Sequence, residues 1–225
     1  MRLTEKHIAI LIFTLSEEEE LQKKPFLKKY ALEQKLTTHT LNIVQKTGLD
    51  YYVYSEQKGN SFGERFTNAI SDIYDKGYDA IITLGNDTPS LNTTHLYKTI
   101  QALQQGQSVI GPSFDGGFYL MGIHRQNYQA EKFIEFSWNT SHVRKELCSH
   151  FKANHTAYLQ LEFLYDLDHV TDTKDVYKTL PYLYKKIKLA LQKLISTTKS
   201  GYRFIQRIWS QYRVRIHYNK GSPIR

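Results

Sequence analysis

Short apolar runs and longer amphipathic stretches alternate along most of the chain. The runs are rich in aliphatic, β-branched or aromatic residues and end at turn residues, a pattern typical of buried strands. The stretches between them carry apolar residues at helical spacing. The pattern predicts strands at residues 7–15, 51–56, 79–85, 108–112 and 117–123, and helices at residues 21–46, 62–76 and 93–105.

This order of elements predicts an α/β fold, with a mostly parallel sheet that has helices on both faces. Residues 117–123 follow residues 108–112 too closely for a helical crossover, so we expect one of these two strands to run antiparallel. Ser61 and Glu64 predict a capping box at the start of one helix. Three later elements are also expected: a helix at residues 141–153, a strand near residues 158–167, and a helix from about Thr173 to Pro181.

The composition is that of a soluble globular protein and bears on its compartment. The chain has 225 residues, of which 40% are hydrophobic and 23% charged, which suits one α/β domain with an extension. Its one cysteine, Cys148, excludes an intrachain disulfide and favours a reducing compartment. The apolar run at residues 7–15 is too short to cross a bilayer and lacks a small-residue cleavage site. We therefore expect a cytoplasmic protein.

Charge divides the chain into two unequal parts. Residues 1–175 hold all 22 acidic residues and 18 of the 30 basic ones, whereas residues 176–225 hold 12 basic residues and no acidic ones. This asymmetry indicates a mildly acidic body with a basic tail. We predict a boundary near residue 178, between a domain at residues 1–178 and a basic amphipathic extension at residues 179–225.

Within the basic tail, apolar residues recur at helical spacing between lysines and arginines over residues 183–217. Three interpretations stay open. The tail could form helices that pack on the body or on a second subunit. It could lie on an anionic membrane at the inner membrane face, where each basic residue contributes about 1 kcal/mol. Contact with nucleic acid is the third, which the lack of a recognised binding module disfavours.

An isoleucine-rich run ends abruptly in the sequence Gly85-Asn86-Asp87-Thr88-Pro89. Pro89 stops the strand, so Asp87 is expected at the carboxyl end of a buried strand. This is the edge of an open α/β sheet at which ligands bind. A carboxylate there suits Mg²⁺ or Mn²⁺ bound against a diphosphate, because hard cations prefer oxygen ligands. The alternative is an aspartate that only shapes a turn or caps the next helix.

A second candidate is Asp115, which precedes Gly116 and Gly117. Two adjacent glycines allow the backbone to approach a ligand closely, and the aspartate can accept hydrogen bonds from a base or a sugar hydroxyl. A plain turn between two strands would have the same sequence.

Asp166 and Asp168 form a third acidic group. If they close a strand, both side chains lie on one face, and two such carboxylates are unfavourable without a nearby cation. Asp168 is therefore a candidate to complete a metal site with Asp87. The alternative is an acidic strand end that leads into the next helix.

Lys58, Arg65 and Trp138 are the remaining candidates. Lys58 and the glycines near it precede a helix whose amino terminus could receive phosphate, and Arg65 would contact phosphate or sugar. A solvated loop-to-helix junction explains the same residues. Trp138 could stack on a base or a sugar, or belong to the core. The nine histidines show no zinc-ligand spacing.

Taken in order, these segments resemble one bacterial family. It is a glycosyltransferase-A-like family related to 2-phospholactate guanylyltransferase and molybdenum cofactor guanylyltransferase, and the resemblance covers roughly residues 50–176. The matching segments are Gln57 with Gly59, Phe62 to Phe66, Asn68 with Ala69, Leu84 to Pro89, Gly111 to Ser113, Asp115 to Gly122, Phe136 to Trp138, and Tyr165 to Asp168.

The resemblance implies a nucleotide-diphospho-sugar transferase fold for the domain at residues 1–178. It also implies a nucleotide over the carboxyl ends of the first strands and a divalent metal on an Asp-containing motif. Asp87 matches the family's strand-end aspartate, and Asp168 falls near its late acidic motif. The Asp-Gly-Gly turn of the family is matched by Asp115, Gly116 and Gly117.

The segment after the first strand departs from the family pattern. Family members carry a glycine and several cations there, which suit a nucleoside triphosphate, whereas this chain has four glutamates at residues 17–20. Carboxylates at contact distance repel phosphate. Lys23, Lys24 and Lys28 are the cations that could substitute from the following residues.

The sequence thus predicts a metal-dependent transferase that acts on a nucleotide-activated substrate. The missing glycine favours glycosyl transfer over nucleotidyl transfer, which stays as an alternative. A third hypothesis is a non-catalytic binding protein that docks to a membrane or a partner through its tail. The predicted roles are catalysis by Asp87 and Asp115, metal binding by Asp87 and Asp168, and nucleotide or substrate binding by Lys58, Arg65, Gly116, Gly117 and Trp138.

Overall fold

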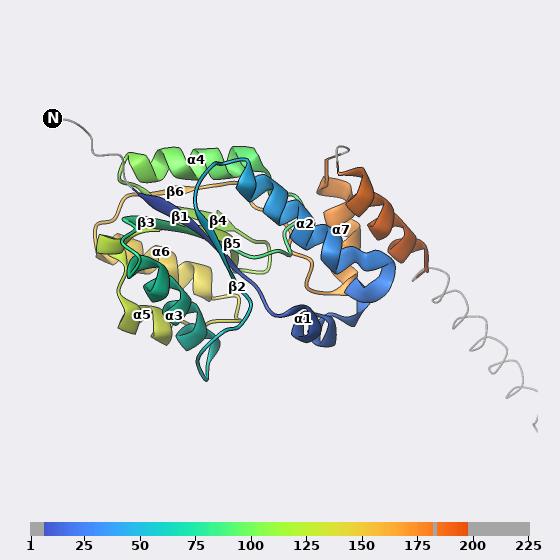
Figure 1. The fold of residues 1–225 in the computed structure, drawn as a ribbon, viewed down its shortest axis with the longest axis horizontal. Coiled ribbons are helices and arrows are strands. Elements are labelled where there is room, and N and C mark those ends of the chain that lie inside the picture. The colour runs from blue at the N-terminus through green and yellow to red at the C-terminus, as the bar shows by residue number, and fades with distance from the viewer. Residues whose placement is uncertain (1–6, 182–183, 198–225) are drawn as a thin grey trace, which may run out of the picture.

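Six strands form one sheet in the order β2-β1-β3-β5-β4-β6 in the computed structural model, which describes residues 7–181 and 184–197 (Figure 1). β1 is parallel to β2 and β3, β4 is parallel to β6, and β5 is antiparallel to β3 and β4. This confirms the predicted sheet and its antiparallel strand. The strands are β1 (Ile8–Phe13), β2 (Tyr51–Tyr54), β3 (Ala80–Leu84), β4 (Ser108–Pro112), β5 (Phe118–His124) and β6 (Tyr158–Gln160).

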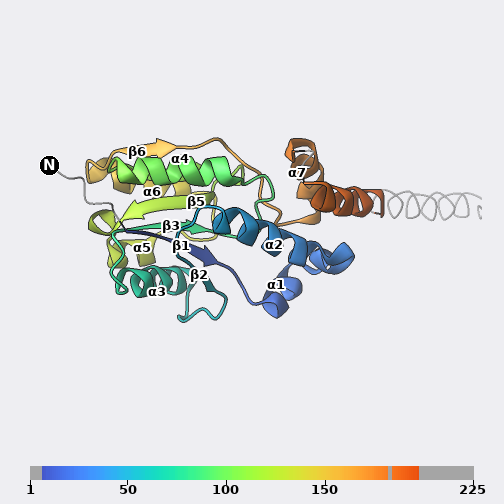
Figure 2. The same cartoon turned by 45° about the horizontal axis from the view of Figure 1, so that its top comes forward.

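Helices cover both faces of the sheet (Figure 2). α2 and α4 pack on one face, and α3, α5 and α6 pack on the other. The predicted α/β class with helices on both faces is therefore confirmed. The helices are α1 (Glu17–Lys23), α2 (Leu32–Gln45), α3 (Phe62–Tyr74), α4 (Thr93–Gln104), α5 (Ala130–Glu135), α6 (Val143–Ala153) and α7 (Thr173–Thr179), with 3-10 helices η1 (Pro25–Ala31), η2 (Arg125–Asn127) and η3 (Val170–Asp172).

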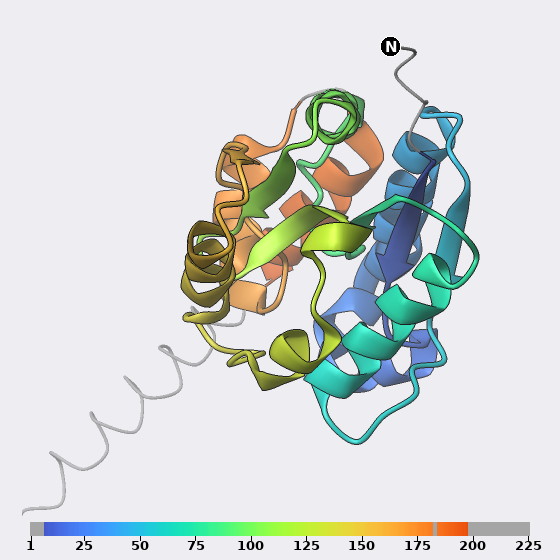
Figure 3. The ribbon, with the colours of Figure 1, turned by 90° about the vertical axis from the view of Figure 1, so that its left-hand side faces the viewer.

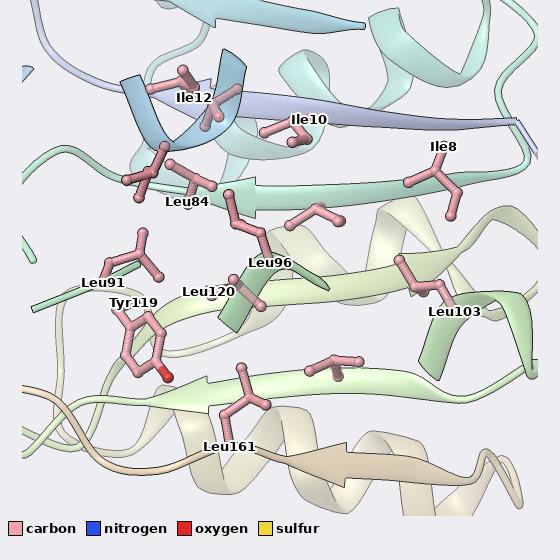
Figure 4. Close-up of a cluster of buried hydrophobic side chains, with 14 of the residues drawn as sticks. Ile8, Ile10, Ile12, Leu84, Leu91, Leu96, Leu103, Tyr119, Leu120 and Leu161 are labelled. Atoms are coloured by element: carbon pink, nitrogen blue, oxygen red, sulfur yellow. The ribbon is translucent and has the colours of Figure 1, made fainter. Parts of the chain in front are cut away.

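Burial on both faces explains why β1 is apolar without alternation. Ile10 and Ile12 face α2 and α4, where they join a cluster that includes Leu96 (Figure 4). Ala9 and Leu11 belong to the cluster on the opposite face, which includes residues of α3. α3 lies beside β1 on that face (Figure 3). Helices on both faces of the sheet therefore hold β1 and β3 and fix the position of their carboxyl ends.

The single helix predicted at residues 21–46 is wrong. The chain forms α1, η1 and α2 instead. Pro25 lacks an amide hydrogen and ends α1. Tyr30 and Ala31 then adopt left-handed backbone, with φ of 63° and 48°, before α2 begins. These breaks place Lys24 at a corner of the chain, between α1 and η1.

The strand predicted near residues 158–167 is shorter than expected. β6 ends at Gln160, and residues 161–167 are irregular apart from a bridge between Ser113 and Leu164. The predicted cap of α3 is confirmed in part, because the Ser61 hydroxyl accepts a hydrogen bond from the Glu64 amide at 3.1 Å. The Glu64 carboxylate, however, accepts from the Asn60 amide instead of closing a box at Ser61.

Residues 185–197 are helical and pack on the part of the chain that precedes them. Ile187, Leu191 and Leu194 are buried in a cluster with Leu27 and Leu32 from the η1–α2 segment. In the described residues, no helix is both long and apolar enough to cross a membrane. The apolar tail positions Leu183, Phe204, Ile205, Ile208, Trp209 and Tyr212 lie outside the described residues. The boundary near residue 178 and a membrane or partner surface at residues 183–217 therefore stay predictions.

Substitutions on the buried and on the exposed side of this last helix should change stability by different amounts. Leu191 is fully buried, whereas Leu189 is 53% exposed. We expect Leu191→Ala to lower the free energy of unfolding by about 2–4 kcal/mol, because it leaves a cavity in a packed cluster. Leu189→Ala serves as the matched control and should change it by no more than about 0.5 kcal/mol. Urea unfolding measures both, and equal effects would contradict the packing of this helix.

Candidate functional site

A cleft of about 710 Å³ opens at the carboxyl ends of β1 and β3 and beside the turn between β4 and β5. This is the edge at which ligands bind in open α/β sheets. The cleft has a cationic and acidic side near α1 and an aromatic side near α3. Of the residues predicted from sequence, Arg65, Asp87, Asp115, Gly117, Trp138, Asp166 and Asp168 line it, together with Glu20, Lys23 and Lys24 from α1 and the residue that follows it.

Asp87 and Asp168 converge on one cation, the ammonium of Lys24. Lys24 Nζ lies 2.9 Å from Asp87 Oδ2 and 2.7 Å from Asp168 Oδ1. A backbone hydrogen bond of 2.9 Å from the Leu167 amide to the Asp87 carbonyl holds the two segments together. The late acidic motif therefore lies beside the end of β3, although no strand leads into it.

Charge and burial oppose each other in this ion-pair group. Burial would raise the pKa of Asp87, but the Lys24 ammonium outweighs it and holds that pKa below its usual value. Burial would lower the pKa of Lys24, and the two carboxylates raise it instead. For Asp168, burial and the charge of Asp87 together raise the pKa in spite of Lys24. The single ammonium of Lys24 thus offsets the cost of burying the charge of Asp87 but not that of Asp168.

Asp166 lies deeper than Asp168 and has a different partner. Its Oδ1 accepts a hydrogen bond of 2.5 Å from the Thr88 hydroxyl, directly after Asp87 in the chain. Burial and the nearby charge of Asp87 raise the pKa of Asp166 well above its usual value, which favours the neutral acid. Asp166 therefore supports the end of β3, whereas Asp168 provides charge to the cleft.

The turn after β4 is shaped by the carboxylate of Asp115. Its Oδ1 accepts hydrogen bonds from the Ser113 hydroxyl at 2.5 Å and from the Gly117 amide at 2.9 Å. Gly116 has φ of +97°, and a Cβ there would lie 2.7 Å from the Cα of Ser141 and closer still to its carbonyl oxygen. Gly117 lines the cleft and Gly116 does not. The positive φ and the close approach of Ser141 therefore explain why a glycine stands at position 116, whether or not a ligand binds there.

Arg65, in the first turn of α3, and Lys58, in the loop before it, differ in the cavities that they line. Arg65 lines the cleft, and its Nε donates a hydrogen bond of 3.0 Å to Gln57. Gln57 in turn donates to the carbonyl of Thr14 at the end of β1. Lys58 lines a smaller neighbouring cavity of about 460 Å³, which also contacts Gln57 and Arg65. The structure therefore brings Arg65, but not Lys58, to the main cleft.

Trp138 forms part of the aromatic side of the cleft. Its Nε1 donates a hydrogen bond of 2.6 Å to the Phe133 carbonyl. The indole ring packs at 5.3 Å from the ring of Phe62, 5.0 Å from that of Phe66 and 6.0 Å from that of Phe118. The side chain is thus both a packed aromatic residue and a wall of the cleft, which combines the two interpretations from sequence.

Glu20 is a site residue that sequence reasoning misjudges. It is one of the four glutamates expected to repel phosphate, yet its side chain is buried and accepts a hydrogen bond of 3.0 Å from Asn86. Burial raises its pKa against the effects of Asn86 and Lys24. The sequence does carry a signal, because Glu20 and Lys24 are four residues apart and such residues lie on one face of a helix.

The two carboxylates suit a hard cation but do not form a complete metal cage. Within residues 7–181 and 184–197, no group of three or more His, Cys, Asp or Glu side chains is arranged to hold a metal ion by itself. Mg²⁺ in enzymes commonly uses one or two carboxylates and takes its other ligands from water and substrate phosphates. Asp87 and Asp168 fit this pattern, since their oxygens already converge on a positive charge.

Comparison with known proteins finds one family whose model matches this chain. Residues 29–140 match the family described as an uncharacterized protein conserved in bacteria (DUF2064). This match spans just under half of the chain. No curated protein sequence matches the chain. The family match contains the end of β3 with Asp87 and the Asp115 turn, and it ends before Asp168.

Solved structures share the fold at low sequence identity. A provisionally named nucleotide-diphospho-sugar transferase from Desulfovibrio desulfuricans G20 aligns with a TM-score of 0.66 and 20% identity, over 84% of this chain and 98% of that protein. Two weaker likenesses add nothing to this result. One is 4-diphosphocytidyl-2C-methyl-D-erythritol synthase from Anaerococcus prevotii DSM 20548, with a TM-score of 0.44 and 11% identity over 80% of this chain and 96% of that one. The other is Rv0371c from Mycobacterium tuberculosis H37Rv, with a TM-score of 0.45 and 12% identity over 77% of this chain and 98% of that one. The nucleotide-diphospho-sugar transferase fold expected from the resemblance is confirmed.

Proposed function

We propose that this chain is a metal-dependent transferase that acts on a nucleotide-activated substrate in the cleft, and that it transfers a sugar. The observation that carries the proposal is the convergence of Asp87 and Asp168. Their oxygens come from two separate segments and meet at one positive charge, at 2.9 and 2.7 Å. The site lies at the sheet edge where α/β folds bind ligands, and the fold is shared with a provisionally named nucleotide-diphospho-sugar transferase.

In this proposal, Asp87 and Asp168 hold Mg²⁺ or Mn²⁺ and the substrate's phosphates supply further oxygens. When bound, such an ion stabilises the negative charge that develops on the departing phosphate oxygen. The chain's own residues bind and orient the substrate. Asp115 is fixed by Ser113 and Gly117, so its carboxylate is already oriented to accept a hydrogen bond from a sugar hydroxyl or from an N–H group of a base.

After the metal ion, Arg65 provides the second positive charge that would contact the substrate's phosphates. Arg65 lines the cleft, and its Nε donates to Gln57, which in turn donates to the carbonyl of Thr14 after β1. Trp138 contributes an aromatic wall of the cleft for a base or a sugar to pack against. Lys58 and Gly116 have weaker support as ligand contacts, because neither lines the main cleft.

The different placement of Arg65 and Lys58 predicts unequal effects on binding. We expect Arg65→Gln to weaken the binding of a nucleoside diphosphate by about 10- to 100-fold, the usual cost of a lost hydrogen bond to a charged group. Lys58→Gln removes the same charge from the neighbouring cavity and should weaken it by less than about threefold. Calorimetric titration of the two variants measures this difference. Equal losses would place the phosphates nearer to Lys58 than we propose.

The proposal is tested by titrating the protein with UDP, GDP, CDP, GTP and CTP, each in the presence of Mn²⁺ and again with EDTA. We expect a diphosphate to bind only with Mn²⁺, and the preferred base to identify the donor. Preference for a triphosphate would favour nucleotidyl transfer instead. If none of the five binds under either condition, the transferase proposal fails and the non-catalytic hypothesis gains support.

A further inference from the structure

Lys24 is the feature of the cleft that the proposed function leaves unexplained. Its ammonium lies against Asp87 and Asp168, the two carboxylates assigned to the metal, and only 15% of its side chain is exposed. Mg²⁺ binds oxygen at about 2.0–2.1 Å. An ion bound by the same two oxygens would therefore take the place of Nζ, and the two cations exclude each other.

We propose that Lys24 is a resident cation that occupies the metal position in the ligand-free cleft and moves to the substrate's diphosphate when the metal enters. Metal and diphosphate then bind cooperatively. This inference rests on the proposed metal site at Asp87 and Asp168. It adds a phosphate-binding residue that the aspartates alone would not reveal.

The surroundings of Lys24 fit such a movement. Its backbone is held, because its amide donates to the Glu20 carbonyl at 2.7 Å and its carbonyl accepts from the Leu27 amide at 3.0 Å. The side chain is a flexible stem with a compact charge that can turn without moving the backbone. Pro25 fixes the corner at which the stem begins. Lys24 can thus exchange partners while α1 and η1 stay in place.

Charge balance explains why the two ligands would help each other. A metal that enters alone must expel the ammonium from its two carboxylates, and a partly buried charge without a partner is costly. A diphosphate supplies the missing partner for the expelled ammonium. Each ligand therefore lowers the cost of binding the other, and the coupling is reciprocal.

The test is the affinity for Mn²⁺ alone, measured by calorimetry on the full chain and on three variants. Lys24→Gln removes the resident cation and should tighten Mn²⁺ binding by about 5- to 150-fold, the usual range of coupling between ligands. Lys24→Arg keeps a cation there and should bind Mn²⁺ as weakly as the natural chain. Lys28→Gln removes the same charge from an exposed position of η1 outside the cleft and should change nothing.

A second series adds inorganic pyrophosphate at buffered free Mn²⁺. Pyrophosphate should tighten Mn²⁺ binding in the natural chain and have a much smaller effect in Lys24→Gln. Thermal unfolding gives an independent readout, because a ligand that binds only the folded state raises its stability. Mn²⁺ alone should raise the unfolding midpoint of Lys24→Gln more than that of the natural chain.

The outcomes separate this inference from the proposed function. If the natural chain and Lys24→Gln bind Mn²⁺ equally well, the metal site stands and the role of Lys24 is overturned. The same holds if pyrophosphate helps both to the same extent. If neither binds Mn²⁺ with or without pyrophosphate, the metal-dependent function itself fails. Should Lys24→Gln not fold, stronger Mn²⁺ binding by Lys24→Arg than by the natural chain would also overturn the inference.

Discussion

Asp87→Asn is expected to reduce the proposed transferase activity by on the order of a thousandfold, since the proposal assigns to this carboxylate several kcal/mol of charge stabilisation at the departing phosphate. Asparagine keeps the shape of the side chain and removes the charge that binds Lys24 in the free protein. Metal-dependent binding of the nucleoside diphosphate should be lost as well. Turnover with the nucleotide-sugar that carries the preferred base, and calorimetry with Mn²⁺, measure the two effects.

The control for this variant is Asp75→Asn, at an exposed carboxylate beyond the end of α3. Its side chain is 76% exposed and lies 3.8 Å from Arg125, so its charge is largely screened. We expect activity and binding within about twofold of the natural chain. If Asp87→Asn were as active as Asp75→Asn, Asp87 would be only a turn residue, which is the alternative that the sequence leaves open.

Gly116→Ala should have the largest effect on stability, a loss of about 3–5 kcal/mol in the free energy of unfolding. Two costs add: a side chain at φ of +97° is strained, and its Cβ would clash with the backbone of Ser141, whose Cα would lie only 2.7 Å away. Gly77 provides a matched control, because its φ is +95° and a Cβ added there would meet no atom within 4 Å. Gly77→Ala should cost only about 1–2 kcal/mol.

The difference between these two glycine variants isolates the contact with Ser141, which urea unfolding of both proteins measures. Ser141 lines the cleft, so Gly116→Ala should also weaken nucleotide binding by displacing that segment. Equal stability losses in the two variants would show that the turn at Gly116 yields without strain. The Asp-Gly-Gly motif would then need a ligand contact at Gly116 to explain it.

The position of Asp87 could be predicted because its causes are local. An apolar strand, Gly85 and the strand-ending Pro89 all lie within a few residues of it. The same holds for the antiparallel β5, which follows β4 after too few residues for a crossover. Short-range signals of this kind can be read from one sequence, whatever the rest of the chain does.

The partners of Asp87 could not be predicted, because they depend on distant segments. Lys24 is 63 positions away, and the single long helix predicted around it hides the corner that Pro25 creates. The charge of Glu20 suggests repulsion of phosphate, yet its carboxylate accepts a hydrogen bond from Asn86, which is 66 positions away in the chain. Asp168 reaches the site through a backbone bond between Leu167 and Asp87, without the strand that its motif suggests.

The packing of the basic tail also could not be predicted from the sequence alone. Helical spacing predicts which of its residues share a face, but it does not say what covers that face. Leu191 and its neighbours are covered by the η1–α2 segment, so this part of the apolar face is used within the chain. The remainder of the predicted surface, at residues 198–217, lies outside the described residues and stays open to a membrane or a partner.

The most direct test of the proposed site is a crystal structure of the protein with Mn²⁺ and the nucleoside diphosphate that binds best, with the ion located by its anomalous scattering. We predict an anomalous peak between the carboxylates of Asp87 and Asp168, with the diphosphate beside it and the Lys24 ammonium moved onto a phosphate oxygen. A nucleotide bound outside this cleft, or Mn²⁺ bound away from both carboxylates, would contradict the proposed transferase site.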